Sequence, residues 1–336
     1  MPWPDPPSFP ERSQEVDAHH VLCQIVVDRL QLIGGNVSAI SQYDYRSIVG
    51  RSFGNFVVVR ELGRGAMGVV FAGYQKTLKR QVAVKLLPKA LAASDSARTQ
   101  FRDEAETVAV LDHPHIITIF DSGEDDEFFY QVMQLVDGPD LGELLARLRR
   151  HPVPSRRRLP LNHAIRVIRE VLDGLEFAHE EGVVHQDLKP ANILIDNRQG
   201  RALVADFGIA KTKHIEFFAR GLVVGTPNYL APEQAAARET DRRTDIYAVG
   251  VILFELLAGF LPVRDESGRE ALLRKVRDAD SFFTRRPCEC SGDIDHGLEQ
   301  IILKATAGDP TERFPSARAF SLALERWLTA RTAEAM

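Results

Sequence analysis

The pattern of apolar and polar positions divides the chain into a strand-rich part followed by a helix-rich part. Short runs rich in β-branched and aromatic residues predict strands at 56–60, directly after the glycines of 62–71, and at 81–86, 116–120 and 128–135. Beyond residue 137 the apolar positions follow a helical period, which predicts helices at 141–148, 161–179 and 316–329. Five strands with one main helix, followed by a run of helices, indicate the α+β class.

The N-terminal residues have a different pattern. Residues 1–12 are rich in Pro without periodicity, which predicts a disordered tail. Apolar residues near helical spacing predict a helix over Ser13–Ile33, ended by Gly-Gly-Asn. This helix either packs on its own domain or docks a partner or second copy. Residues 36–53 give no clear signal, so we divide the chain into the tail, an extension at 13–52 predicted to be helical, and a domain at 53–330.

Composition and charge exclude several classes of protein. Of 336 residues 44% are hydrophobic and 26% charged, as in soluble globular proteins, and a net charge of −5 gives no attraction to nucleic acid or an anionic membrane. The longest apolar run, Ala248–Gly259, is shorter than the roughly 20 residues of a membrane span. Three cysteines suggest a reducing compartment, and Cys288 and Cys290 alone are too few for a zinc site, which wants about four ligands. We expect a cytoplasmic protein that binds neither nucleic acid nor membrane.

A glycine-rich segment between two predicted strands is a candidate phosphate-binding loop. Gly63, Gly65 and Gly68 fit G-x-G-x-x-G, which dinucleotide-binding folds place between a strand and a helix. Here β-branched and aromatic residues flank both sides, which favours a hairpin whose N–H groups can close over a triphosphate. Lys85 lies in the next predicted strand, which is apolar, and burying its ammonium is costly unless the charge is paired. A buried Lys85 with an acidic partner is therefore favoured over a Lys85 at the sheet edge whose ammonium reaches solvent. The candidates in the helix predicted at 94–111 are Asp103, Glu104 and Glu106.

The stretch 183–208 carries the residue types of a phosphoryl-transfer site. Asp187 can accept a hydroxyl proton, Lys189 can steady a phosphate, and Asn192 with Asp206 can hold a divalent ion. The order H-x-D-x-K-P-x-N followed by D-F-G is rarely met by chance and resembles the protein kinase superfamily. The wording of GRGAMGVVF, HPHII, GTPNYLAPEQ and DPTERFPSA is most similar to bacterial eukaryotic-like (Hanks-type) Ser/Thr kinases.

The resemblance implies a bilobal kinase fold, with an N-lobe at 53–136 and a mostly helical C-lobe at 137–330. It implies transfer from ATP to Ser/Thr hydroxyls of protein substrates with Mg²⁺, for which Mn²⁺ is considered as a substitute. The catalytic residues would be Asp187, Lys189, Lys85 and its partner Glu104, and the metal ligands would be Asn192 and Asp206. The nucleotide would contact Leu62, Gly63, Arg64, Gly65, Ala66, Gly68, Val70, Ala83, Lys85, Met133, Gln134, Val136 and Leu194. A homodimer through the N-lobe or the N-terminal helix is considered, since relatives often dimerise through the N-lobe.

One position departs from the family pattern. Gln186 stands where the family most often has an Arg that pairs with a phosphate on the activation loop, and an uncharged Gln cannot make that charge-assisted pair. The loop at 209–230 holds two threonines. Thr226 matches the threonine that supports the catalytic Asp, and Thr212 lies too close to D-F-G for the usual phosphosite. We predict a loop that reaches its active form without phosphorylation.

The resemblance also assigns structural roles near the site. Asp245, which opens an apolar helix, would brace the catalytic loop, and Arg313 would pair with the buried Glu233. The basic segment 147–158 is interpreted as a solvated face, with docking of an acidic partner as the alternative. Two other functions are considered: a pseudokinase scaffold, which the intact site residues disfavour, and a small-molecule kinase, which the peptide platform GTPNYLAPE disfavours.

Overall fold

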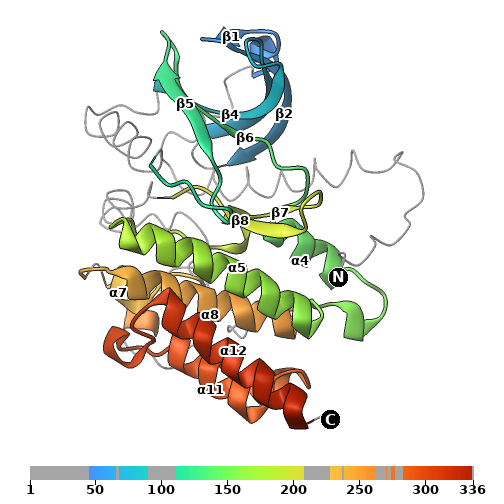
Figure 1. Ribbon diagram of the computed structural model, residues 1–336, viewed down its shortest axis with the longest axis vertical. Coiled ribbons are helices and arrows are strands. Elements are labelled where there is room, and N and C mark those ends of the chain that lie inside the picture. The colour runs from blue at the N-terminus through green and yellow to red at the C-terminus, as the bar shows by residue number, and fades with distance from the viewer. Residues whose placement is uncertain are drawn as a thin grey trace. The chain divides into compact units, whose positions relative to one another are not determined.

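The computed structural model describes residues 45–65, 68–89, 110–207, 228–236, 238–261, 270, 274–276 and 283–334. The chain forms two compact units, Met1–Arg102 with Ile119–Leu135, and Asp103–Thr118 with Val136–Met336. The first unit holds a sheet, and the second is mostly helical with one small hairpin, as Figure 1 shows. The α+β class is therefore confirmed. The predicted tail and the predicted helix over Ser13–Ile33 lie outside the described residues.

An antiparallel sheet of six strands, in the order β1-β2-β3-β4-β6-β5, forms the first unit. The strands are β1 (Ser52–Phe53), β2 (Phe56–Gly65), β3 (Gly68–Gln75), β4 (Arg80–Pro88), β5 (Ile119–Glu124) and β6 (Phe128–Gln134). The five predicted strands are present, and the two-residue β1 is added at an edge because Gly54, with φ 55°, turns the chain back onto β2. The strand predicted at 116–120 begins late: Ile116 forms only an isolated bridge with Val204, and β5 starts at Ile119.

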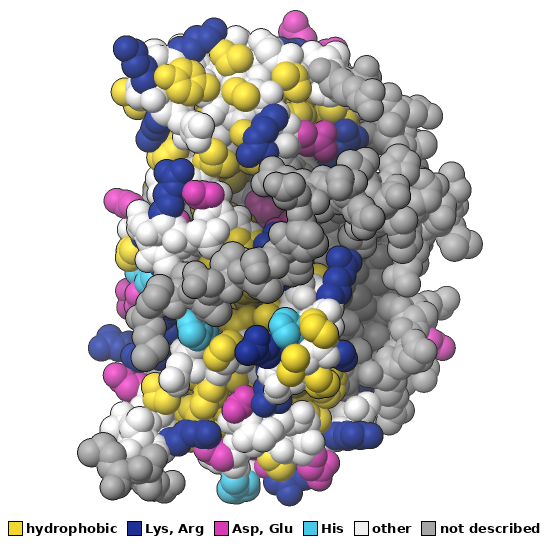
Figure 2. Space-filling model, turned by 90° about the vertical axis from the view of Figure 1, so that its right-hand side faces the viewer, with side chains coloured by type: hydrophobic (Ala, Val, Ile, Leu, Met, Phe, Trp, Pro, Cys, Tyr) yellow, Lys and Arg dark blue, Asp and Glu magenta, His cyan; other side chains and the backbone are white. Residues whose placement is uncertain are grey.

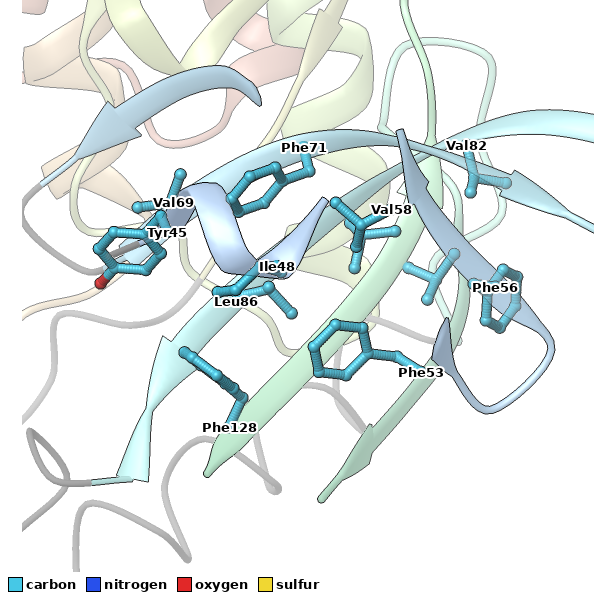
Figure 3. Packing of buried hydrophobic residues seen from close by; sticks show 12 residues of the cluster. Tyr45, Ile48, Phe53, Phe56, Val58, Val69, Phe71, Val82, Leu86 and Phe128 are labelled. Carbon is cyan, nitrogen blue, oxygen red and sulfur yellow. The ribbon is translucent and has the colours of Figure 1, made fainter. Parts of the chain in front are cut away.

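The core of the first unit is a cluster of buried apolar side chains, shown in Figure 3. Val82, Val84 and Leu86 alternate along β4, so they lie on one face of the sheet. The short 3₁₀ helix η1 (Tyr45–Ile48) adds Tyr45 and Ile48, each 1% exposed, to this cluster. The apolar core thus begins ahead of Phe53, in a segment whose residues show no clear periodicity.

A charged contact ties the segment after η1 to the far side of the sheet. Arg51 donates to the carboxylate of Asp125 at 2.7 Å and also bonds Glu127, both in the turn between β5 and β6. The Arg51 guanidinium lies 5.2 Å from the ring centre of Phe53 and 5.5 Å from that of Phe128. Residues 45–53 are therefore held both by apolar burial and by ion pairs.

The second unit is built around α8 (Arg242–Ala258), in which every residue from Thr244 to Leu257 is buried. The other helices are α4 (Leu141–Arg149), α5 (Leu161–Glu180), α7 (Pro232–Ala235), α10 (Pro287–Cys290), α11 (His296–Ala305) and α12 (Ala317–Glu334), with 3₁₀ turns η3 (Pro154–Arg156), η4 (Pro190–Asn192) and η5 (Pro310–Glu312). Helix α8 packs against α5 and α11, and α12 packs against α5 and α11 (Figure 1). None of the described helices combines the length and the apolar character needed to cross a bilayer.

Helix α8 begins three residues earlier than predicted. We expected Asp245 to open it, but Asp241 is the N-cap, and its carboxylate accepts the N–H of Arg243 at 2.8 Å. Asp245 lies in the first turn and is 1% exposed, so its carboxylate points into the unit. Aspartate is a common N-cap residue, so the sequence alone does not show which of Asp241 and Asp245 caps the helix. Their different packing in the folded unit does.

Helix α10 contains both cysteines of the Cys-Glu-Cys pair, Cys288 and Cys290. Among the residues that the structure describes, no group of three or more His, Cys, Asp or Glu side chains could hold an ion. Cys288 instead donates its backbone N–H to Glu299 at 3.2 Å. Glu299 is fully buried on α11 and also bonds Arg286. This part of the unit is therefore held together by a buried carboxylate.

Lys, Arg, Asp and Glu side chains are interspersed over the face seen in Figure 2. The segment 147–158 is mostly exposed, in keeping with the solvated-face interpretation. Arg158 pairs with Asp293 at 3.1 Å, and Arg149 donates to the carbonyl of Gly259 at 2.8 Å. Part of this basic segment is thus engaged within its own unit.

Candidate active site

The loop that carries Asp187 is fixed by a buried carboxylate on α8. Asp245 accepts the backbone N–H groups of His185 at 2.9 Å and Gln186 at 2.8 Å, and its Oδ2 lies 2.8 Å from Nε2 of His179. Gln186 has φ 64°, a left-handed conformation that costs energy for a residue with a Cβ and needs support from its surroundings. The bracing contact predicted for Asp245 is confirmed.

Three polar side chains of this loop form one connected group. The ammonium of Lys189 lies 2.7 Å from Oδ2 of Asp187, and the Asn192 amide donates to the Asp187 carbonyl at 2.8 Å. The side chains of Asp187 and Lys189 are 26% and 28% exposed, so a substrate can reach them from solvent. An oriented carboxylate next to an ammonium can accept a proton while the ammonium balances charge on a phosphate.

The hairpin of β7 (Ile193–Asp196) and β8 (Arg201–Val204) brings Asn192 and Asp206 to the same end. Ile193 pairs with Val204, and one step further the Ala205 N–H donates to the Asn192 carbonyl at 2.9 Å. Asp206, with φ 60°, is exposed, whereas the next residue, Phe207, is 1% exposed.

These two oxygen donors fit a Mg²⁺ site. Magnesium prefers hard oxygen ligands, uses one or two protein groups, and completes its octahedron with water and substrate phosphates. Asn192 and Asp206 supply one amide and one carboxylate at adjoining positions.

The buried Lys85 lies on the central strand β4 of the first unit, 6% exposed, opposite Val70 on β3 and Gln131 on β6. A lysine at an exposed sheet edge is therefore excluded. Glu104 lies outside the described residues, as does nearly all of the helix predicted at 94–111, so the ion pair with Lys85 stays a prediction.

The glycine-rich segment is the predicted hairpin. β2 and β3 are antiparallel, and Gly65 pairs with Gly68 at the tip. Gly68 has φ 133°, and a Cβ there would lie 2.1 Å from the carbonyl oxygen of Leu86. A glycine is therefore required at this position. The strand–hairpin–strand order contradicts a dinucleotide-binding arrangement.

The other residues expected at the nucleotide belong to both units. In the first unit Ala83 on β4 faces Met133 on β6, and both are buried. Leu62, Gly63 and Arg64 near the hairpin tip are exposed, and Ala66 lies outside the described residues. Three further side chains are partly buried: Gln134 in the first unit, and Val136 and Leu194 in the second.

Residues 56–324 match the family model described as protein kinase domain. The chain belongs to the protein kinase family. This kinase domain is 36% identical over 284 residues to the serine/threonine-protein kinase Pkn1 of Myxococcus xanthus, covering 83% of this chain and 39% of that protein. It is 35% identical over 269 residues to the serine/threonine-protein kinase PrkC of Bacillus subtilis, covering 80% and 39%.

Solved structures agree with this assignment. A crystal structure of the Mycobacterium tuberculosis PknI kinase domain superposes with a TM-score of 0.64 at 31% identity, covering 83% of this chain and 98% of that one. The bilobal fold and the resemblance to bacterial Ser/Thr kinases are therefore confirmed. The chain matches about two fifths of the length of the two curated relatives.

The kinase domain also contains the predicted buried ion pair. The two Nη groups of Arg313 each lie 2.8 Å from an oxygen of Glu233, and the hydroxyl of Thr244 donates to Glu233 at 2.8 Å. Both partners are almost fully buried. This pair fixes α7, at the end of the activation segment, to the turn η5.

Gln186, the departure from the family pattern, is tied to residues that follow the activation segment. Its side-chain amide donates to the hydroxyl of Thr240 at 3.1 Å, and its carbonyl accepts from the Gln234 side chain at 2.6 Å. Gln186 is 7% exposed. Thr212 and Thr226 lie outside the described residues.

One group next to the catalytic loop was missed by sequence reasoning. The hydroxyl of Tyr229 donates to Glu255 at 2.5 Å, and Arg149 bonds the other carboxylate oxygen. Burial raises the pKa of Glu255, although these two bonds act in the opposite direction. The sequence does show Glu255 as a single acidic residue inside an apolar helix, but that pattern does not reveal Tyr229 and Arg149 as its hydrogen-bond partners.

Proposed function

We propose that this chain is an active protein kinase that transfers the γ-phosphoryl group of ATP to Ser or Thr hydroxyls of protein substrates, with Mg²⁺. The observation that carries the proposal is the connected group of Asp187, Lys189 and Asn192 on a loop held by Asp245. Phosphoryl transfer depends mainly on positioning and charge stabilisation, and this group supplies both.

Each residue has a defined task. Asp187 accepts the proton of the substrate hydroxyl and orients its oxygen, while Lys189 balances the charge of Asp187 and of the transferred phosphoryl group. Asn192 and Asp206 would hold Mg²⁺, which when bound neutralises charge on the phosphate oxygens. Lys85, with Glu104 as its predicted partner, would bind the phosphates nearer the adenosine.

The domain reaches its active form without a phosphate on residues 209–230. A neutral amide at Gln186 cannot pair with a phosphate as a guanidinium does. Its Nε2 is bonded to Thr240 instead, in a site that is nearly closed to solvent. These contacts of Gln186 form without any modification of the loop.

The decisive experiment is intact-mass analysis after incubation with ATP and Mg²⁺, comparing wild type with Asp187→Asn and adding a generic protein substrate. Phosphates on wild type or on the substrate, and none with the variant, are expected. Nucleotide binding without any transfer would support the scaffold alternative, and transfer only to metabolites would support a small-molecule kinase. Repeating the assay with Mn²⁺ tests metal choice.

A second variant tests the activation mechanism. Thr212→Ala is expected to keep the activity of wild type, because Gln186 occupies the position from which a guanidinium would receive a loop phosphate. Loss of activity in a folded Thr212→Ala protein, or phosphates that cluster on Thr212 and Thr226, would contradict independence from phosphorylation. A homodimer through the N-lobe or N-terminal helix, and a cytoplasmic location, stay predictions from the sequence.

A further inference from the structure

A buried lysine, Lys275, contacts the last residues of the loop at 209–230, just ahead of α7. Its ammonium lies 2.7 Å from the carbonyl oxygen of Asn228 and 2.5 Å from that of Leu230, and the residue is 1% exposed. An ammonium removed from water is costly unless it is hydrogen-bonded, and two backbone carbonyls supply strong acceptors. The cost of burying this charge is thus offset by contacts that fix one short stretch of backbone.

The residue between these two carbonyls is held from the other direction. The Tyr229 side chain donates to Glu255 on α8, while the carbonyls on either side of it accept from Lys275. Three contacts therefore determine both the backbone path and the side-chain direction of this stretch. A segment held in this way is pre-organised before a ligand arrives.

The held segment lies next to the catalytic loop. Asp187, Lys189, Tyr229 and Leu230 line one small cavity, and the Gln234 side chain reaches the carbonyl of Gln186 at 2.6 Å. The segment 228–231 therefore lies close to the position that a substrate hydroxyl would take at Asp187.

Charged groups around Lys275 favour a contact with neutral carbonyls. The Tyr247 ring centre lies 5.0 Å from the ammonium of Lys275 and 4.9 Å from the guanidinium carbon of Arg313. Burial, followed by the charges of Arg274 and Arg313, lowers the pKa of Lys275, and Glu233 acts in the opposite direction. A neutral amine still has two N–H donors, so both carbonyl contacts can form in either protonation state.

We propose that Lys275 is a positioning residue for the protein substrate, because it sets the backbone of the segment 228–231 against which the substrate chain docks. This inference rests on the proposed function, since it assumes a polypeptide as phosphoryl acceptor. Lys275 acts through the segment and touches neither nucleotide nor metal in this assignment. Its removal should weaken the use of protein substrate while leaving the use of ATP unchanged.

The test compares Lys275→Met with Lys304→Met, a lysine on α11 whose ammonium lies 4.9 Å from the Phe314 ring. Steady-state kinetics with a peptide substrate are measured at varied peptide and varied ATP. Lys275→Met should raise the KM for peptide roughly 10- to 100-fold, the effect of losing two hydrogen bonds to backbone carbonyls, with the KM for ATP unchanged. Lys304→Met should match wild type.

The outcomes separate the two proposals. The role of Lys275 is overturned if wild type transfers phosphate and Lys275→Met has an unchanged KM for peptide. It is also overturned if Lys275→Met lowers kcat alone and leaves both KM values unchanged. If wild type transfers no phosphate to any polypeptide, the proposed function itself fails. Should Lys275→Met not fold, Lys275→Gln, which keeps a shorter neutral donor, takes its place with the same expected rise in peptide KM.

Discussion

Replacing Arg313 by Met should strongly destabilise the second unit. Arg313 is fully buried, and its fork bonds both oxygens of Glu233 at 2.8 Å. It also donates to the carbonyls of Ala307, Arg243 and Gly308 at 2.8, 3.0 and 3.2 Å. Met has a similar length but no donors, so the variant leaves the Glu233 carboxylate buried with Thr244 as its remaining hydrogen-bond donor among the contacts described above.

The expected magnitude follows from that lost partner. Removing one member of a buried ion pair costs about 3–5 kcal/mol, because an uncompensated charge stays behind. In a domain of about 200 residues each kcal/mol lowers Tm by about 2–4 °C, so Tm should fall by about 6–20 °C. Arg198→Met is the matched control. Its pair with Asp137 at 2.9 Å is exposed on both sides and should contribute at most about 1 kcal/mol.

Urea unfolding of Arg313→Met, Glu233→Gln and the double variant measures the coupling directly. The double variant should be less destabilised than the sum of the single variants by at least about 1 kcal/mol, because Glu233→Gln removes the unpaired charge. A cost for Arg313→Met no larger than for Arg198→Met, or strictly additive single effects, would refute the reasoning.

Three further outcomes are expected. Ile48→Ala should cost about 2–5 kcal/mol in urea unfolding because it empties part of the core, whereas Val49→Ala, half exposed, should cost under about 0.5 kcal/mol; equal costs would contradict the placement of η1. Gly68→Ala should lower Tm and weaken nucleotide binding, and an unchanged Tm would disprove the close approach at the hairpin tip. Burial alone would raise the pKa of Glu299, but hydrogen bonds led by that of Arg286 lower the pKa from 4.5 to about 2. The ionised Glu299 carboxylate therefore stabilises the fold above about pH 4.5, and this contribution is lost as pH falls toward about 2. Glu299→Gln should therefore lose less stability than wild type between about pH 6 and about pH 3, and equal losses would contradict this assignment.

Features encoded by neighbouring residues could be predicted from the sequence. The hairpin around Gly65 and Gly68 follows from glycines flanked on both sides by β-branched and aromatic residues, and Lys85 follows from one charge in an apolar run. The order of Asp187, Lys189 and Asn192 on one loop is likewise a local property.

Features that depend on distant partners could not be predicted. Tyr45 and Ile48 lie on a single 3₁₀ turn, too short to show a period, and their burial depends on strands that come later in the chain. Lys275 is separated from Asn228 by 47 residues, and Tyr229 from Glu255 by 26. No spacing rule links such positions, so the contacts of Lys275 and Glu255 with the segment 228–231 could be found only from the folded structure.

The position of Asp245 late in the sequence determines when, during synthesis, the loop that carries Asp187 can take its folded conformation. The catalytic loop leaves the ribosome before its anchor, since Asp245 follows His185 by 60 residues. In the same way, Arg313 follows its partner Glu233 by 80 residues. Until α8 has emerged and packed, the N–H groups of His185 and Gln186 are bonded to water and Gln186 has no support for its left-handed backbone. A nascent chain that has not yet formed α8 therefore carries Asp187, Lys189 and Asn192 but lacks the Asp245 contacts that fix their loop.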